Sequence, residues 1–415
     1  MGKLLFLSHR IPYPPDKGDK IRAWHILRHL MQSYEVFVGC LVDDPADWAH
    51  VPALRARCAN LGCFPLNPRW QKLRALSRLR PGKPLTLDYF HSPRLRRWVL
   101  DTIEREAIDR IFVFCSAMVP YVIDAAGVHR VLDFIDADSS KWTEYAERSR
   151  WPMNWVWARE GRTLLRFERL AARSFDHSLF VSEDELLHFR SLAPESVGRT
   201  SFISNGVDFR HFSPSHPFDD PFPTGGARIV FTGAMDYRPN IDAVSWFARE
   251  VMPALRDRGP PPGFWIVGAN PAEEVRRLAA LPGVHVTGRV PDTRPYLAHA
   301  DVVVAPLRIA RGIQNKVLEA MAMGRPVVAT PQAFQGIRAE PGHDLLIADD
   351  AAALARCVTE VLDGLHPMLG RHARSMVETR YDWSTTLAPL DTIWQPEPPA
   401  VHSGPVRLPQ PGVLT

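Results

Sequence analysis

The sequence has no long hydrophobic run. No stretch approaches the roughly 20 apolar residues that a membrane-spanning helix needs. The first apolar run, residues 4–7, is also too short for a secretory signal peptide. We therefore expect a cytoplasmic protein, with peripheral contact at the inner face of a membrane left open.

Cysteine is scarce and is not spaced like a metal site. The five cysteines are odd in number, and none of their spacings is typical of zinc ligands. This favours reduced thiols over a disulfide framework. They are Cys40, Cys58, Cys63, Cys115 and Cys357.

The chain also has little net charge. Its 50 lysines and arginines against 46 acidic residues leave a formal charge of +4, which is small for 415 residues and gives no argument for a nucleic-acid partner. An apolar content of 46% and a charged content of 23% are ordinary for a globular protein.

Short apolar runs alternate with amphipathic helical stretches along most of the chain. This alternation predicts an α/β protein with two doubly wound, Rossmann-like parallel sheets, which bind ligands at the carboxyl ends of their strands in a central cleft. The expected strands are 4–7, 36–40, 111–115, 131–135 and 179–181 in the first half, and 229–232, 265–267, 284–286, 302–305, 327–329 and 345–347 in the second.

Composition places the boundaries between these units. A segment rich in proline and glycine, 213–226, is the expected linker between a domain at 1–212 and another at 227–380. A helix at 381–395 is expected to pack back toward the first domain. The proline-rich tail, 396–415, is expected to be disordered.

Residues 310–330 carry the strongest local pattern, which reads as a glycine loop, a helix, a Gly-Arg-Pro stop and a buried strand. Lys316 and Glu319 lie three positions apart, so they share one helix face near its N-terminus. A lysine at a helix N-terminus attracts phosphate, and a carboxylate one turn later can accept hydrogen bonds from a ribose. The pattern indicates a nucleotide site; the alternative is a surface ion pair.

Several motifs together resemble a known family. They are Asn-Gly-Val-Asp at 205–208, the turn at Gly233 within 231–240, and the block from Gly312 to Thr330, accompanied by residues 10–22 and 133–142. In order and spacing they are similar to the GT-B glycosyltransferases of family 4. More narrowly, they resemble the sugar transferases associated with exosortase-type exopolysaccharide loci. The resemblance covers residues 1–395.

The resemblance implies a retaining, metal-independent hexosyltransferase-type enzyme that uses a nucleotide diphosphate sugar and no other cofactor. It makes the first domain the acceptor side and the second the nucleotide-sugar side. One departure is clear. Family 4 enzymes usually carry two glutamates eight positions apart; Glu319 fits the second, but the first position is Arg311.

On the donor side we expect Lys316 and Arg311 to stabilise the diphosphate and Glu319 to hold the ribose. The other reading of Arg311 is a solvated loop residue. Glycines are expected where the backbone approaches the donor. The further donor-side candidates are Gly18, Gly233, Arg238, Gly312 and the pair Arg289 and Val290, which are expected to hold the base.

On the acceptor side, Asp133, Asp136 and Asp138 gather at the end of a predicted strand and are expected to point into the cleft. Asp136 ranks first as the acceptor-side group. Asp138 is the second candidate, with helix capping as its alternative. No convincing metal site is present. Asp19 and Asn240 are interpreted as helix caps, and His25 as a core or solvent histidine.

One segment is basic and free of acidic residues. Its cations are Arg69, Lys72, Arg74, Arg78, Arg80 and Lys83, interleaved with large apolar residues. This spacing fits an amphipathic helix on anionic lipid, where a lipid-linked acceptor would be found, or a solvated basic face. Four tryptophans at 142–157 fit either an acceptor groove or core packing.

Two other functions share this architecture. A sugar-nucleotide epimerase would need acid and base groups on both walls of the cleft. A nucleotide-sugar-binding subunit without activity would explain the missing first glutamate. The sequence identifies neither the sugar, the base, the acceptor nor the oligomeric state.

Overall fold

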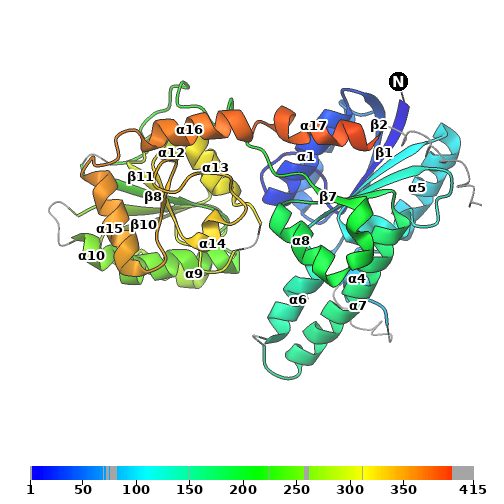
Figure 1. The fold of residues 1–415 in the computed structure, drawn as a ribbon, viewed down its shortest axis with the longest axis horizontal. Coiled ribbons are helices and arrows are strands. Elements are labelled where there is room, and N and C mark those ends of the chain that lie inside the picture. The colour runs from blue at the N-terminus through cyan, green and yellow to red at the C-terminus, as the bar shows by residue number, and fades with distance from the viewer. Residues whose placement is uncertain are drawn as a thin grey trace, which may run out of the picture.

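The computed structural model describes residues 2–68, 70–71, 74, 82–147, 149–223, 225–256, 261–310 and 312–394. Within these ranges the chain forms two α/β domains side by side (Figure 1). The first contains a seven-stranded sheet in the order β3-β2-β1-β4-β5-β6-β7, with parallel pairing throughout. Its strands are β1 (Gly2–Ser8), β2 (Tyr34–Val42), β3 (Asn60–Pro65), β4 (Arg110–Phe114), β5 (His129–Ile135), β6 (His177–Phe180) and β7 (Thr200–Phe202).

Helices cover this sheet on both faces, and two of them, α6 and α7, extend away from it as a hairpin (Figure 1). The α-helices of the domain are α1 (Gly18–Leu30), α2 (Val51–Arg55), α4 (Leu85–Tyr89), α5 (Pro93–Glu106), α6 (Asp138–Glu147), α7 (Met153–Ser174) and α8 (Glu183–Leu192). Short 3-10 helices lie at η1 (Pro45–His50), η2 (Ser116–Tyr121) and η3 (Pro194–Arg199).

The second domain repeats the plan with a six-stranded parallel sheet in the order β10-β9-β8-β11-β12-β13 among the described residues. The strands are β8 (Arg228–Thr232), β9 (Gly263–Val267), β10 (Val284–Gly288), β11 (Val302–Ala305), β12 (Val327–Ala329) and β13 (Leu346–Ile347). The helices are α9 (Arg238–Trp246), continued by a π-helix η4 (Phe247–Val251) and by α10 (Met252–Arg256), then α11 (Glu273–Leu278), α12 (Arg294–Ala298), α13 (Asn315–Ala322), α14 (Pro331–Phe334), α15 (Ala351–Leu362) and α16 (Leu369–Arg380).

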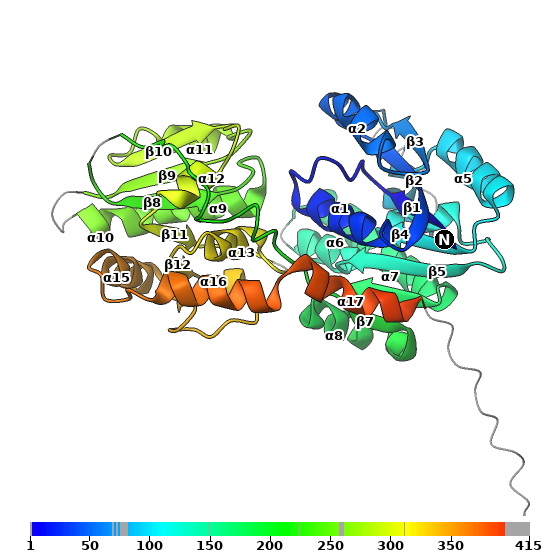
Figure 2. The ribbon, with the colours of Figure 1, turned by 90° about the horizontal axis from the view of Figure 1, so that it is seen from above.

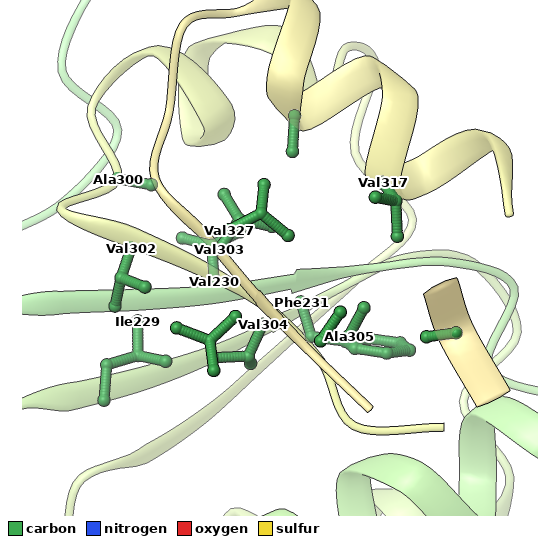
Figure 3. Packing of buried hydrophobic residues seen from close by; sticks show 14 of the residues in the cluster. Ile229, Val230, Phe231, Ala300, Val302, Val303, Val304, Ala305, Val317 and Val327 are labelled. Atoms are coloured by element: carbon green, nitrogen blue, oxygen red, sulfur yellow. The ribbon is translucent and has the colours of Figure 1, made fainter. Parts of the chain in front are cut away.

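The central strands of the second sheet are buried on both faces, which is why the sequence predicts them. Val230, Phe231, Val303, Val304 and the β12 residues are buried beneath helices (Figure 3). Strands covered on both faces have unbroken apolar sequences. All six strands expected in the second half, and the five expected in the first, are confirmed. β3 and β7 were missed because Asn60, Gly62, Thr200 and Ser201 interrupt their apolar pattern.

The chain crosses between the domains twice, and the two crossings lie side by side. The Val207 amide donates to the Tyr381 carbonyl at 2.8 Å, and Val207 forms a bridge with Asp382. Immediately afterwards α17 (Trp383–Ile393) packs on the first domain, while α16 packs on the second (Figure 2). Trp383 is buried and stacks on His25, with ring centroids 4.3 Å apart, so His25 is a core residue.

The proline-rich segment does not run freely between the domains. Phe218 and Phe222 pack on the core of the second domain, and the first crossing lies upstream, next to Val207. The physical reason is the aromatic content of the segment. Burying a phenylalanine side chain lowers the free energy by more than the conformational entropy that the segment loses when it is held against the domain. The expected linker at 213–226 therefore belongs, as far as it is described, to the surface of the second domain.

Close backbone approach at the crossing yields a prediction. A Cβ on Gly206 would lie 2.8 Å from the Tyr381 carbonyl oxygen and 2.8 Å from the Trp383 ring. Gly206→Ala should therefore destabilise the protein by about 1–3 kcal/mol, the usual cost of overpacking. Differential scanning calorimetry measures this as a lowered melting temperature.

Gly198→Ala is the matched control, because a Cβ there would meet nothing within 4 Å. Equal melting temperatures for the two variants would show that the crossings are not tightly packed at Gly206.

Candidate functional site

Lys316 is held in position by two side chains of the second domain, Asn240 and Phe231. It lies in the first turn of α13, and its Nζ donates to Asn240 Oδ1 at 2.5 Å. The same Nζ lies 4.3 Å from the centre of the Phe231 ring. Burial lowers the pKa of Lys316 to about 7, although the nearby Glu319 carboxylate partly opposes the shift. The ammonium is thus desolvated and positioned, which are the features of an anion-binding lysine.

Glu319 lies one turn further along α13, on the same face. Burial raises the pKa of its carboxyl to about 7, and Lys316 partly opposes this rise. Lys316 Nζ bonds to Asn240 rather than to Glu319. The alternative of a surface ion pair is therefore wrong. Each half-buried group retains hydrogen-bonding capacity for another molecule.

Asn240 has a different role from the one expected. It lies inside α9 rather than before it, and its Nδ2 donates to the Ala234 carbonyl at 2.8 Å while its Oδ1 accepts from Lys316. The prediction of a helix cap is wrong, because the first-turn geometry of α9 directs the amide toward Lys316. The partner lies 76 positions away in sequence, so no local pattern could have identified it.

Glycines make room around Lys316. A Cβ on Gly233 would lie 2.7 Å from Asn240 Nδ2 and 3.1 Å from Lys316 Nζ. Gly268, at the end of β9, presses against the Gly233 carbonyl, where a Cβ would meet the oxygen at 1.7 Å. The loops after β8 and β9 therefore approach more closely than side chains would allow. Gly268 was not identified from the sequence.

The first domain meets this region through Asp136 and Gly18. Gly312 adopts φ +64°, and a Cβ there would lie 3.5 Å from Asp136 Oδ1 and 3.4 Å from Val181. A Cβ on Gly18, at the start of α1, would lie 3.9 Å from Asn315 Nδ2, next to Lys316. All these residues follow the carboxyl ends of strands, so the two sheets face each other at the ends where such folds bind ligands.

The acceptor-side aspartates share one cation. Lys141 Nζ lies 3.0 Å from Asp136 Oδ2 and 3.0 Å from Asp138 Oδ1. The pKa of Lys141 is raised well above its usual value by these two carboxylates, despite its burial. Asp138 is the first residue of α6. The two aspartates and Lys141 form a charged cluster facing Gly312, and Lys141 was not singled out from the sequence.

Asp133 does not belong to that cluster. It is fully buried, and its carboxylate accepts from Arg22 Nε at 2.7 Å and from Arg22 Nη2 at 3.3 Å. The expectation that Asp133 points into the cleft is wrong, because its carboxylate is paired with the buried guanidinium of Arg22 on α1. Arg22 also donates to the Ile203 carbonyl at 2.7 Å and to Asn205 Oδ1 at 3.1 Å.

Asn205 carries this network to the other domain, since its Nδ2 donates to Asn315 Oδ1 at 3.2 Å. A continuous set of hydrogen bonds therefore joins the core of the first domain to the start of α13. The residue beside Asn315 is Lys316, so the network fixes the donor-side helix relative to the first domain.

The strands of the first domain end in strained backbone beside this network. Ile135 has φ +69° and Cys115 has φ +80°, a region that costs residues other than glycine about 1–3 kcal/mol. The Cys115 amide donates to the Asp133 carbonyl at 2.8 Å, and the Ile135 amide donates to Asp133 Oδ1 at 3.0 Å. The Asp133–Arg22 pair thus holds the turn that presents Asp136.

Asp19 is not a helix cap either. Its carboxylate accepts from Arg10 Nη1 at 3.0 Å and lies 3.4 Å from His9 Nε2, whereas Lys17 occupies the cap position of α1. Although burial acts in the opposite direction, His9 and Arg10 hold the pKa of Asp19 far below its usual range. His9 follows β1, so this His–Asp–Arg cluster lies at the edge of the first sheet that faces the second domain.

The remaining donor-side candidates lie further out. Arg238 is exposed at the first position of α9. Arg289 is exposed just after β10, the edge strand, and Val290 packs on the core of the second domain. The structure brings Gly233 next to Lys316 and Gly312 next to Asp136. Arg238, Arg289 and Val290 lie instead in or beside the segments that follow β8 and β10.

Three predictions concern residues that lie wholly or partly outside the described ranges. Arg311 lies outside the described residues. So does most of the basic stretch from Arg69 to Lys83; of its cations, Arg74 and Lys83 are described, and Lys83 forms an ion pair with Asp88 at 2.9 Å. The proline-rich tail also lies outside them.

The described residues contain no cluster of three or more histidines, cysteines or carboxylates arranged to hold a metal ion. Within the same ranges, no helix is both long and apolar enough to cross a lipid bilayer.

With this geometry established, comparisons with known proteins give a consistent result. Residues 226–364 match the family described as glycosyl transferases group 1. The chain is 22% identical over 220 residues to an uncharacterized 44.6 kDa protein in the cps region of Klebsiella pneumoniae, covering 50% of this chain and 53% of that protein. It is 29% identical over 203 residues to a phosphatidyl-myo-inositol mannosyltransferase of Mycobacterium leprae, covering 46% and 52%.

The alignments therefore span about half the length of the curated relatives. Among solved structures, HepE of Anabaena in complex with UDP superimposes with a TM-score of 0.67 at 15% identity, covering 94% of this chain and 99% of that chain. The fold is that of the GT-B glycosyltransferases, and the fold class expected from the sequence is confirmed.

The lowered pKa of Lys316 predicts how stability changes with pH. Between about 7 and its ordinary value of 10.5, the unfolded chain holds a proton that the folded chain has lost. Because of Lys316, the free energy of unfolding therefore increases as pH rises above about 7. Lys316→Met, which removes the buried charge, should be stabilising at pH 7, and this advantage should shrink as pH rises toward 9.5.

Urea denaturation at a series of pH values measures the difference between wild type and Lys316→Met. Lys17→Met, at an exposed lysine, is the control and should show no such pH-dependent difference. A constant difference for Lys316→Met across the series would contradict the assignment of a neutral lysine in the folded site.

Proposed function

We propose that this protein is a retaining glycosyltransferase that moves a sugar from a nucleoside diphosphate donor to a glycan or a lipid-linked acceptor in exopolysaccharide biosynthesis. One observation carries the proposal: Lys316 and Glu319 share the first turns of α13, beside Gly233 and opposite Asp136. We propose Lys316 as the cation for the phosphate and Glu319 as the carboxylate for the ribose, on the side of the site opposite the charged cluster of the first domain.

The donor side supplies charge to the leaving group. When the bond between the sugar C1 and the diphosphate oxygen breaks, the electron pair stays on the diphosphate, and a fixed ammonium stabilises the growing negative charge. Lys316 is placed for this by Asn240 and Phe231. Arg311 is proposed as a second cation. With two cations available, the proposal requires no bound metal.

The acceptor side orients the incoming hydroxyl. Asp136 accepts hydrogen bonds, and Lys141 fixes its carboxylate together with that of Asp138. The acceptor hydroxyl gives its proton to the Asp136 carboxylate as its oxygen forms the new bond to C1. This bond forms on the face that the diphosphate leaves, so the configuration is retained. Gly18 is proposed to approach the diphosphate from the first domain, Arg238 to contact phosphate, and Arg289 and Val290 to hold the base.

The named relatives support the setting of this reaction. The K. pneumoniae relative is described as lying in a cps region, the M. leprae relative as a phosphatidyl-myo-inositol mannosyltransferase, and the HepE structure as containing UDP. We therefore propose a nucleotide-sugar donor such as a UDP-sugar, and a site of action at the cytoplasmic face of the membrane.

Donor turnover tests the proposal. A thermal-shift screen of nucleotide sugars first identifies the donor, because binding to the folded state raises its stability. Acceptor-dependent release of the nucleoside diphosphate, with the anomeric configuration of the product read by NMR, would then support a retaining transferase. Sugar isomerisation would indicate an epimerase instead, and binding without turnover would indicate a non-catalytic subunit.

Variants divide the roles. Lys316→Met should lower kcat by about 10²–10³, the usual loss when one charge-stabilising donor is removed. Glu319→Gln should mainly raise the donor KM, because ribose contacts are equally present in ground and transition states. Arg311→Ala with unchanged kinetics would remove Arg311 from the mechanism. Arg371→Gln, at an exposed residue of α16, is the control.

Donor binding should also change the protonation of Lys316. At pH 8 a lysine with a pKa of about 7 is mostly neutral, and a bound diphosphate favours its charged form. Binding of the nucleoside diphosphate should therefore take up protons. Calorimetry in Tris and in HEPES, buffers with different ionisation enthalpies, measures this uptake.

Lys316→Arg keeps the charge but titrates far above pH 8, so any binding that it retains should be independent of the buffer. Equal binding enthalpies for the wild type in both buffers would contradict a neutral Lys316 in the free site.

A further inference from the structure

The loop between β8 and α9 leads from the donor side of the site toward the first domain. It begins at Gly233, beside the donor-side lysine, and ends at Tyr237, whose side chain is 59% exposed. Burial of the hydroxyl raises the pKa of Tyr237, and Lys141 of the first domain partly opposes this rise. Tyr145 and Asp136, also of the first domain, add to it. A tyrosine that is exposed and yet surrounded by groups of the other domain lies at the opening of the site.

Tyr145 lies on the face of α6 that carries the charged cluster. Asp138, Lys141 and Tyr145 occupy positions i, i+3 and i+7 of this helix, which follow one another along a single face. Seven residues of α-helix rise about 10 Å, so this face continues well beyond the aspartates. The Tyr145 side chain is 51% exposed. Figure 1 shows α9 extending from α10 toward the first domain, to which α6 belongs. Each domain therefore contributes one exposed tyrosine beside the charged cluster.

The neighbouring face of α6 is fixed against α7. A Cβ on Gly161 would lie 2.7 Å from Thr143 Oγ1, so the two helices are in close contact there. Trp142 stacks on Trp157 of α7 with ring centroids 4.8 Å apart. The Trp142 ring also meets the Tyr145 ring edge-on, with centroids 5.8 Å apart. The exposed tyrosine is thus supported from one side by packed tryptophans.

The chemistry of this surface identifies its occupant. A pyranose has faces made of C–H groups and a rim of hydroxyls. The faces pack on aromatic rings, and the rim hydroxyls bond to phenols, carboxylates and ammonium groups. Tyr145 and Tyr237 provide the rings, and the ion pair of Lys141 with Asp138 provides polar partners next to them. A lipid chain would also gain from the rings, but it would desolvate charges to which it cannot bond.

We propose that Tyr145 and Tyr237 form a binding subsite for the second sugar residue of an acceptor glycan, counted from the sugar whose hydroxyl reacts at Asp136. The reacting sugar occupies the position at the aspartates, so a ring further along α6 belongs to the next residue of the chain. This inference rests on the proposed function and narrows its acceptor to one that ends in at least two linked sugars. The two tyrosines determine specificity and do not touch the reacting atoms.

Saturation-transfer NMR with the full chain tests glycan binding without a donor and without turnover. The probes are di- and trisaccharides of glucose, mannose and galactose, with the corresponding methyl glycosides for comparison. The wild type should bind at least one of the longer probes about tenfold more tightly than its methyl glycoside, because a second sugar ring is packed between aromatic side chains.

Variants locate the second ring. Tyr145→Ala and Tyr237→Ala should each weaken binding of the longer probe by about tenfold and leave the methyl glycoside unaffected. Tyr145→Phe and Tyr237→Phe keep the ring and should retain most of the binding. Trp155→Ala is the matched control: Trp155 is 55% exposed on the same hairpin, but it lies two positions from Trp157 and so on another face of α7. Circular dichroism shows that each variant is folded.

Failure of every longer probe to bind the wild type would overturn the inference. Unchanged binding by both alanine variants, or an equal loss in Trp155→Ala, would do the same. If the alanine variants instead lose the thermal shift produced by UDP and keep glycan binding, the tyrosines close around the donor and the inference is also wrong. Glycan binding that depends on both tyrosines, without transfer of any sugar, would count against the proposed function alone.

Discussion

The buried pair of Arg22 and Asp133 is the interaction on which the candidate site depends. It joins α1 to β5, and through Ile203 and Asn205 it reaches the crossing between the domains and the start of α13. Removing one partner of such a pair costs about 3–5 kcal/mol, because the other charge stays buried. Because the pair lies beneath the turn that leads to Asp136, losing it would both destabilise the protein and disturb the position of Asp136.

The two sides of the site treat charge differently. On the first domain, each carboxylate has a cation nearby: Asp136 and Asp138 have Lys141, and Asp19 has Arg10. On the second domain, burial acts against the charged forms of both Lys316 and Glu319. A bound diphosphate would supply the counter-charge that Lys316 lacks. Without a ligand the charged form of Lys316 thus lacks a counter-charge strong enough to offset its burial, whereas the carboxylates on the acceptor side are already paired with cations.

Sequence patterns predicted what depends on near neighbours. Strands buried on both faces were found because their apolar runs are unbroken, and Lys316 and Glu319 were placed together because helix periodicity fixes their spacing. The misassigned residues were those whose partners are remote. Asn240 bonds to a lysine 76 positions away and Asp133 to an arginine 111 positions away. In the sequence, an asparagine or aspartate near the start of a helix shows the same pattern whether it caps that helix or bonds to a remote side chain.

The two crossings between the domains also limit how the molecule can move. Only Tyr381 and Asp382 separate α16 on one domain from α17 on the other, and the Val207 amide ties the first crossing to the second. Rotation of one domain relative to the other must therefore be absorbed by a few backbone torsions in two strands that turn together. The covalent connection between the domains is thus narrow: two short segments, joined to each other by one backbone hydrogen bond, carry the chain across.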